Sequence, residues 1–190
     1  MKIIYFDTET TGLNPVVNDI IQFAGIIEID GEEKERFDFK LQPFSYENIN
    51  QSAMSVHGIT AEQLKNFDSP GEAYNKIISI FDKYIDKYDK NDKFIVCGYN
   101  VKFDVDFLKE FFSKNKNNYL FSYFGVVKDP LPVLGYLKSI NKIDCENLKL
   151  ESVCKIFGIE IFNAHNALAD IDATRSVIKK VDEILNSVKL

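Results

Sequence analysis

The stretch FDTETTGL, residues 6–13, follows directly on the apolar run KIIY, residues 2–5, which is typical of a β-strand. Asp7 and Glu9 are two residues apart, so on an extended backbone they project from the same side. Two adjacent carboxylates repel each other unless cations or protons neutralise them. Oxygen ligands on a rigid strand end suit Mg²⁺ or Mn²⁺. The alternative is a strand followed by a polar turn, with two solvated acids.

Working outward, the first forty residues predict three strands, Lys2–Asp7, Asp19–Ile29 and Glu33–Leu41. Asp30-Gly31 lies between the last two and is typical of a tight hairpin turn. The wholly apolar run Phe94–Gly98 predicts a further strand buried inside the sheet. Strands that first follow one another and then alternate with helices indicate an α/β fold with a sheet of mixed direction.

Several start signals predict helices. Ser69 as N-cap, Pro70 at the first helical position and Glu72 at the third begin a helix whose apolar stripe continues to Tyr88. Further helices are expected over Asp104–Lys114, Val133–Ser139, Lys149–Phe157 and from near Asn166 to the C-terminus. The segment from 115 to 128 predicts a loop that could include a strand, and Pro130 and Pro132 are expected to break it.

Composition narrows the class of protein. The chain has 190 residues, which predicts one domain over 1–190, and no apolar run of about 18 residues that would predict a membrane span. The net charge of −6 argues against an architectural DNA-binding protein, but not against an enzyme that handles one chain end. Cys97, Cys145 and Cys154 form no metal-binding or CxxC pattern, and no secretory leader is visible. We therefore expect a cytoplasmic protein with reduced thiols.

Two further aspartates lie on the apolar faces of predicted helices. Asp104 precedes Phe107, Leu108 and Phe111 by three, four and seven positions, which places it on the core-facing stripe, whereas Asp106 points to the opposite side. In the last helix, Asp170 shares a face with Ala173, Thr174, Val177, Val181 and Val188, while Asp172 points away. Asp106 and Asp172 are therefore expected to be solvated surface acids.

A carboxylate on a buried stripe needs a partner, because an isolated buried charge is costly. A structural salt bridge to a buried arginine or lysine is one explanation, but the chain has only two arginines, Arg36 and Arg175, and the motifs bring no lysine close. A divalent cation accounts for Asp104 and Asp170 together and would also neutralise Asp7 and Glu9. Four carboxylates around two Mg²⁺ ions, about 4 Å apart, are the two-metal arrangement that cleaves phosphodiesters.

The chain has two histidines. His165 lies five positions before Asp170, so it reaches the same site only if it sits in the loop before the helix. There it could act as a general base beside an attacking water, or simply cap the helix start. His57, in Ser55-Val56-His57-Gly58-Ile59, could contact a substrate or merely anchor its turn.

Three segments in order resemble a known family. They are Asp7-x-Glu9 within FDTETTGL, the run GYNVKFD (98–104) followed by Phe107-Leu108, and His165-x4-Asp170. They are similar to the three motifs of the DnaQ-like 3′–5′ exonucleases whose third motif carries histidine, a family that includes the proofreading ε subunit of bacterial DNA polymerase III. The run VHGI (56–59) also resembles this family, and the likeness extends from residue 3 to about 180.

The resemblance implies a ribonuclease-H-like fold, with a five-stranded mixed sheet flanked by helices. It implies release of nucleoside 5′-monophosphates from the 3′ end of single-stranded or frayed DNA, in proofreading or repair. Asp7, Glu9, Asp104 and Asp170 would hold two divalent cations, Mg²⁺ or Mn²⁺, and His165 would deprotonate the attacking water. By motif position, the terminal nucleotide would contact Thr10, Leu13, His57, Asn100 and Phe103, although Phe103 could equally be a core residue.

Three points stay open at this stage. Asp129-Pro130-Leu131-Pro132 stands where many members of the family have Asp-Thr, which puts the adjoining wall of the site in question. Because no residue decides the sugar, trimming of RNA is the alternative to DNA. A non-catalytic module that binds nucleic acid or a partner is the alternative from another class. The chain ends soon after the last helix, which favours a free-standing enzyme or one that docks on a polymerase by its surface.

Overall fold

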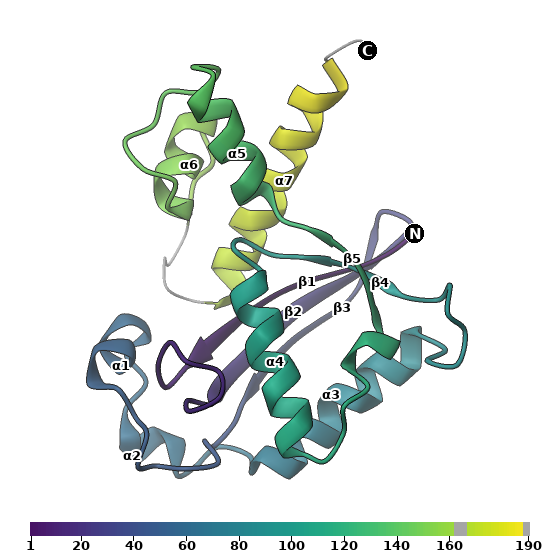
Figure 1. Cartoon of the computed structure of the whole chain (residues 1–190), viewed down its shortest axis with the longest axis vertical. Helices are drawn as coiled ribbons and strands as arrows, with labels where there is room; N and C mark the ends of the chain where they lie inside the picture. Colours follow the sequence, from purple (N-terminus) through teal and green to yellow (C-terminus); the bar gives the residue numbers. More distant parts are fainter. Residues whose placement is uncertain (162–166, 188–190) are drawn as a thin grey trace.

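The computed structural model describes residues 1–161 and 167–187. A five-stranded sheet in the order β3-β2-β1-β4-β5 lies at its centre (Figure 1). The strands are β1 Lys2–Thr10, β2 Ile20–Ile29, β3 Glu32–Lys40, β4 Phe94–Cys97 and β5 Phe124–Lys128. β1 pairs antiparallel with β2 and parallel with β4, so the sheet is mixed, as predicted, and β4 is an interior strand.

Seven α-helices and one 3₁₀ turn are present in the part of the chain that the structure describes. They are α1 Gln51–His57, α2 Ala61–Leu64, α3 Pro70–Tyr84, α4 Lys102–Lys114, the turn η1 Leu120–Ser122, α5 Pro130–Ser139, α6 Leu150–Phe157 and α7 Ala167–Ser187. The fold is α/β, as the order of strands and helices predicted, and its five-stranded mixed sheet is the ribonuclease-H-like one that the family resemblance implied.

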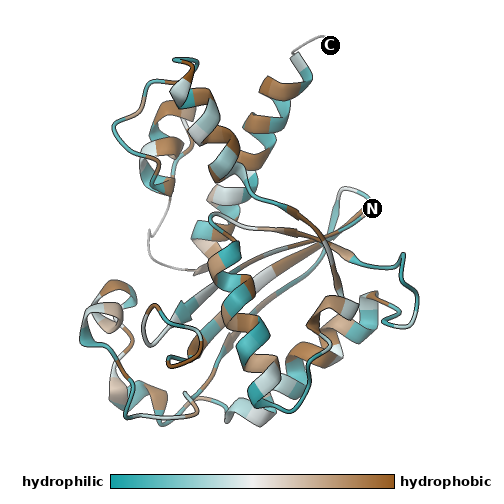
Figure 2. Ribbon diagram, viewed as in Figure 1, coloured by the Kyte–Doolittle hydropathy of each residue, from teal (hydrophilic) through white to brown (hydrophobic). Residues whose placement is uncertain are grey.

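The helices cover the sheet on both faces (Figure 1). The side chains of Ile4 and Phe6 in β1 pack with α3 and α4 in the largest apolar cluster, whereas Ile3 and Tyr5 pack with α7. α5 and α6 rest on α7 in a separate cluster. Figure 2 shows the hydrophobic colour running along the central strands and the helix faces turned toward them. Alternate residues of β1 therefore face different layers, as the period of two requires.

Local signals in the sequence set several boundaries. Asp30 and Gly31 turn the β2–β3 hairpin with φ values of 51° and 87°, the left-handed conformation that glycine adopts without strain. Ser69 and Glu72 form the predicted capping box of α3, with Pro70 in the first turn. A second capping box, between Thr60 and Gln63, begins α2. These short-range signals were therefore reliable.

Other expectations need correction. α3 ends at Tyr84, and Tyr88 is 86% exposed, because Ile85 leaves the helical conformation and ends the predicted stripe. β1 continues to Thr10, beyond the predicted end at Asp7. The segment 115–128, expected to be a loop that could include a strand, contains η1 and the edge strand β5.

The most informative correction concerns the two prolines. α5 begins at Pro130, not at Val133, since Asp129 caps it by accepting a hydrogen bond from the Leu131 backbone N–H at 2.9 Å. Prolines are tolerated in the first helical turn, where the missing N–H has no intrahelical partner. Pro130 and Pro132 therefore belong to the first turn of α5, while the preceding segment ends before them, with β5 closing at Lys128.

No described helix is long and apolar enough to cross a membrane. His165 and Asn166 lie outside the described residues, as does Val188, so the predicted positions of these three side chains are not addressed by the structure.

Candidate active site

The end of β1 presents acids to one face and a hydroxyl to the other. Asp7 and Glu9 lie on the face of Ile3 and Tyr5, which α7 covers, and both are partly buried. Thr8 points the opposite way and is 6% exposed. The ladder to β2 shifts register between Glu9 and Thr10, and such a bulge bends the strand and re-aims its last side chains.

Asp104 meets this strand end from α4. Its side chain is 3% exposed, as its place on the apolar stripe predicted. Asp104 Oδ1 accepts hydrogen bonds from the Thr8 backbone N–H at 3.0 Å and from Thr8 Oγ1 at 2.7 Å. Because β1 and β4 are parallel, the start of α4 after β4 falls beside the carboxyl end of β1. Thr8 thus fixes the orientation of the Asp104 carboxyl group.

The four predicted acids lie close enough to affect one another's charge. Burial raises the pKa of Asp7 well above its usual range, and Asp104, Glu9 and Asp170 raise it further. Burial, followed by Asp170 and Asp104, raises the pKa of Glu9 to about 7. Burial also raises the pKa of Asp104, although the donors from Thr8 oppose that shift. The sheet and two helices therefore bring together acids that are more than 160 residues apart in sequence.

Neither arginine neutralises these acids. Arg36 pairs with Glu33 and Asp172, and Arg175 pairs with Glu28 and Glu33. The salt-bridge explanation that named these arginines is therefore wrong. Asp172 is exposed, as predicted, but it has a partner in Arg36 and is not simply solvated.

All four acids offer carboxylate oxygens, which are the ligands that Mg²⁺ and Mn²⁺ prefer, so the donor set fits such ions. Within the described ranges, however, no three His, Cys, Asp or Glu side chains converge closely enough to hold a metal ion as they stand.

The turn after the acids is built tightly. Thr10 Oγ1 donates to the carbonyl of Gly12 at 2.6 Å, and a Cβ at Gly12 would lie 2.4 Å from Asn18 Oδ1. Any other residue at position 12 would therefore displace the Asn18 side chain, whose Oδ1 accepts from the Asn14 backbone N–H. Leu13 follows and is 80% exposed beside the turn. Thr10 is therefore buried within the site, while Leu13 stands out into solvent.

His57 lies beside Thr10 at the end of α1. The Ile59 backbone N–H donates to His57 Nδ1 at 3.1 Å, so the proton of the neutral ring is on Nε2. Burial lowers the pKa of His57, and the backbone of Thr10 opposes this only in part. Nε2 is buried and has no hydrogen-bond partner among the described residues. The ring is thus anchored in its turn through Nδ1, which supports the anchoring interpretation, while contact with a substrate stays a prediction.

Asn100 and Phe103 flank the start of α4. Asn100 is exposed and adopts the left-handed conformation, with φ of 60°. Phe103 is partly buried, and its ring centroid lies 4.8 Å from that of Phe107. The structure therefore supports a packing contact for Phe103, while leaving part of the ring accessible.

Asp129 ties this turn to α5. Its two carboxylate oxygens accept from the backbone N–H groups of Asn100 at 3.1 Å and Val101 at 3.0 Å, in addition to capping α5. The sequence placed Asp129 at a departure from the family pattern and missed this bridge. Thr8 was missed too. Both interactions join residues about 30 or more positions apart, so no local signal in the sequence indicates them.

We expect Asp129→Ala to lower the free energy of unfolding by about 1.5 kcal/mol, because it removes a helix cap and two further backbone acceptors. Urea unfolding followed by circular dichroism would measure this. Pro132→Ala is the matched control, since it removes no backbone donor from α5, and its change should stay within about 0.5 kcal/mol. Equal effects of the two substitutions would contradict the role of Asp129.

Comparison with known proteins agrees with this geometry. The RNase T family model, described as "Exonuclease", matches residues 4–178. This chain belongs to that DnaQ-like exonuclease family. Among its relatives is the DNA polymerase III PolC-type of Halalkalibacterium halodurans, 30% identical over 173 residues, covering 91% of this chain and 11% of that protein. The chain thus spans about a tenth of the length of such relatives.

Two further proteins, one curated relative and one solved structure, are similar over most of this chain. The ribonuclease T of Buchnera aphidicola is 30% identical over 188 residues, which cover 94% of this chain and 82% of that protein. The zinc-bound form of the E. coli exonuclease I–single-stranded DNA complex has a TM-score of 0.80 at 24% identity, covering 96% of this chain and 40% of that one. At that identity, the structural likeness to exonuclease I shows the fold.

Proposed function

We propose that residues 1–190 form one exonuclease domain that removes nucleoside 5′-monophosphates from the 3′ end of single-stranded or frayed DNA, using two divalent cations. The observation that carries this proposal is the gathering of Asp7, Glu9, Asp104 and Asp170 at the end of β1, where Glu9, Asp104 and Asp170 raise the pKa of Asp7, and Asp170 and Asp104 raise that of Glu9. A protein that only binds nucleic acid gains nothing from four mutually repelling acids. Family membership over residues 4–178 supports the same conclusion.

In this mechanism, the four carboxylates would hold Mg²⁺ or Mn²⁺. The bound ions would supply a lowered pKa for water and offset the charge that develops on the departing 3′ oxygen. His165 accepts the proton of the attacking water. Thr8 keeps the Asp104 carboxyl group oriented, through two hydrogen bonds.

The terminal nucleotide would contact the five residues assigned by motif position: Thr10, Leu13, His57, Asn100 and Phe103. The Nε2–H of His57 is a donor for a sugar or phosphate oxygen, because no described group satisfies it. The exposed side chain of Leu13 suits contact with a base. The accessible part of Phe103 offers a second apolar surface.

DNA is the favoured substrate because PolC-type polymerases are among the relatives, and for the same reason a DNA polymerase is the favoured protein partner. RNA trimming is the second candidate, supported by the relative named ribonuclease T, which aligns over 82% of its length. Matched DNA and RNA oligonucleotides labelled at the 5′ end distinguish them. We expect a ladder of products shortened from the 3′ end, dependent on Mn²⁺ or Mg²⁺ and faster on DNA. Equal loss of label with EDTA present, or immediate release of labelled mononucleotide, would contradict the proposal.

A further inference from the structure

α7 carries Asp170 but is held to the sheet mainly by small and aliphatic side chains. Ala167, Ile171 and Ile178 pack against Tyr5, Ile26 and neighbouring residues of β1 and β2. A second apolar face of α7, with Ala173, Val177 and Val181, packs on α5 and α6. Apolar contacts are non-directional, so a polar contact at this interface would define the rotation of the helix about its axis more sharply.

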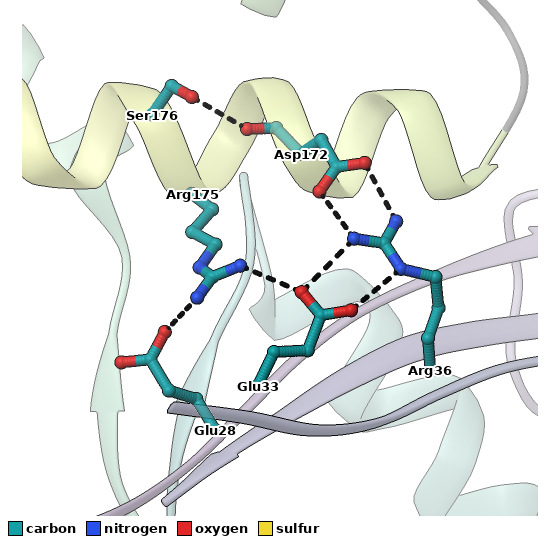
Figure 3. Close-up of polar contacts among 6 residues, drawn as sticks. All are labelled: Glu28, Glu33, Arg36, Asp172, Arg175 and Ser176. Carbon is teal, nitrogen blue, oxygen red and sulfur yellow. Dashed lines mark hydrogen bonds and ion pairs between the residues drawn. The ribbon is translucent and has the colours of Figure 1, made fainter. Parts of the chain in front are cut away.

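A cluster of ion pairs beside this interface provides contacts that orient α7 on the sheet. Its members are Glu28 on β2, Glu33 and Arg36 on β3, and Asp172 and Arg175 on α7 (Figure 3). Arg36 Nη1 donates to Asp172 Oδ2 at 2.8 Å and Nη2 donates to Asp172 Oδ1 at 3.0 Å. This bidentate contact constrains both the distance and the orientation of the two groups.

The other guanidinium completes the cluster. Glu28 and Glu33 are direct cross-strand neighbours, and Arg175 bridges them, with 3.0 Å between Arg175 Nη1 and Glu33 Oε2. The guanidinium carbon of Arg175 also lies 5.6 Å from the ring centroid of Tyr5. Like charges that would repel across the two strands are therefore neutralised by a side chain from α7.

The cluster contacts the neighbours of the site acids. Asp172 is two residues after Asp170, about 200° around the helix, so a rotation that breaks its contact with Arg36 also moves Asp170. Tyr5 is two residues before Asp7 on the same face of β1. The cluster is thus joined to both elements that bring acids into the site.

We propose that the Arg36–Asp172 pair positions α7 so that Asp170 faces Asp7 and Glu9, which rests on the function proposed above. The pair touches no reacting atom and acts through Asp170. Ion pairs this exposed contribute little to global stability. Residues that orient metal ligands, in contrast, commonly change metal affinity or activity by about 10- to 100-fold when replaced.

The test measures Mn²⁺ binding without substrate, from the rise in melting temperature of the full chain with increasing Mn²⁺, alongside kcat. Asp172→Ala is expected to weaken apparent Mn²⁺ affinity and lower kcat by about tenfold each. Its melting temperature in EDTA should stay near that of the unsubstituted chain. Arg36→Lys keeps the charge but loses the fork of donors, so it should behave in the same way.

Asp182→Ala is the matched control. Asp182 also joins α7 to a strand, through Lys128 of β5 at 2.5 Å, but it lies twelve residues beyond Asp170. It should leave Mn²⁺ affinity and kcat unchanged. In the Arg36→Ala/Asp172→Ala double variant, the loss should not exceed that of either single change, since both remove the same contact.

Three results would overturn the inference. One is unchanged Mn²⁺ affinity in Asp172→Ala, while the unsubstituted chain binds Mn²⁺ and hydrolyses its substrate. Another is a loss of Mn²⁺ affinity and kcat in Asp182→Ala equal to that in Asp172→Ala, which would mean only that any weakened contact of α7 with the sheet lowers both. If the unsubstituted chain itself shows neither Mn²⁺ stabilisation nor hydrolysis, the proposed function fails and the positioning role fails with it.

Discussion

Glu9→Gln is expected to abolish metal-dependent hydrolysis and, at the same time, to raise the melting temperature of the protein in EDTA near pH 7.5. The loss follows from removing one carboxylate from the metal-binding set. Charge stabilisation by metal ions contributes several kcal/mol to the transition state, so we expect a rate reduction of about a thousandfold or more. The gain in stability has a separate cause.

Burial and the neighbouring acids raise the pKa of Glu9 from 4.5 to about 7. Between these values the folded protein binds more protons than the unfolded chain. The free energy of unfolding in EDTA therefore falls as the pH rises through this window. Glutamine resembles the protonated acid and removes that part of the decline. At pH 7.5 the variant should be more stable by about 2 kcal/mol, after allowing for solvent screening of a partly buried group.

Differential scanning calorimetry from pH 4.5 to 7.5 in EDTA would measure this effect. The two melting curves should coincide near the acid end and diverge toward pH 7.5. Glu62→Gln removes the same charge from the exposed helix α2 and should change neither hydrolysis nor the pH profile. A Glu9→Gln protein that is less stable at pH 7.5, or still active, would refute the assignment of Glu9 to a cluster of repelling acids.

His165→Ala is expected to lower kcat by about 10²- to 10³-fold, the usual contribution of a general base. The rise in melting temperature with Mn²⁺ should persist, since this residue is not among the four acids. KM should change little. The measurement is single-turnover hydrolysis of a labelled oligonucleotide at saturating substrate, with Mn²⁺ stabilisation recorded on the same sample.

His57→Ala provides the contrast, because the chain has only these two histidines. His57 is proposed to bind the terminal nucleotide through Nε2, so its loss should raise KM more than it lowers kcat. The residual rate of His165→Ala should continue to rise with pH, since hydroxide then replaces the missing base. The opposite pattern, with His165 affecting KM and His57 affecting kcat, would exchange the two roles.

The sequence predicted which faces of β1 and α4 carry Asp7, Glu9 and Asp104, but not the contacts that support them. The spacing of Asp7 and Glu9, and the apolar residues after Asp104, follow periodicities that the backbone imposes, so those faces were predictable. Thr8 and Asp129 were not, because each acts through contacts with residues distant in sequence. Asp172 was expected to be solvated for the same reason, since helical periodicity places it outside but does not indicate Arg36 opposite it.

The predicted ends of helices and strands were wrong where helix capping or tertiary contacts outweighed the local amino-acid composition. Pro130 and Pro132 looked like breaks in a loop, yet they fall in the one helical turn that tolerates them, after the cap supplied by Asp129. Tyr88 continued an apolar spacing that the backbone leaves at Ile85. β5 carries Val126 and Val127 exposed at the edge of the sheet, so it lacks the alternation that marks a half-buried strand.

The alternation along β1 has a consequence for how this protein can change. Ile4 and Phe6 fill the core beneath α3 and α4, while Tyr5, Asp7 and Glu9 face α7. A single residue inserted or deleted inside the strand would exchange these sets, sending the acids into the apolar interior and the core side chains toward the proposed metal site. The same alternation of residues along β1 therefore decides both the packing of the core and the position of the acids. We expect insertions and deletions only outside this strand, at turns such as Asp30-Gly31.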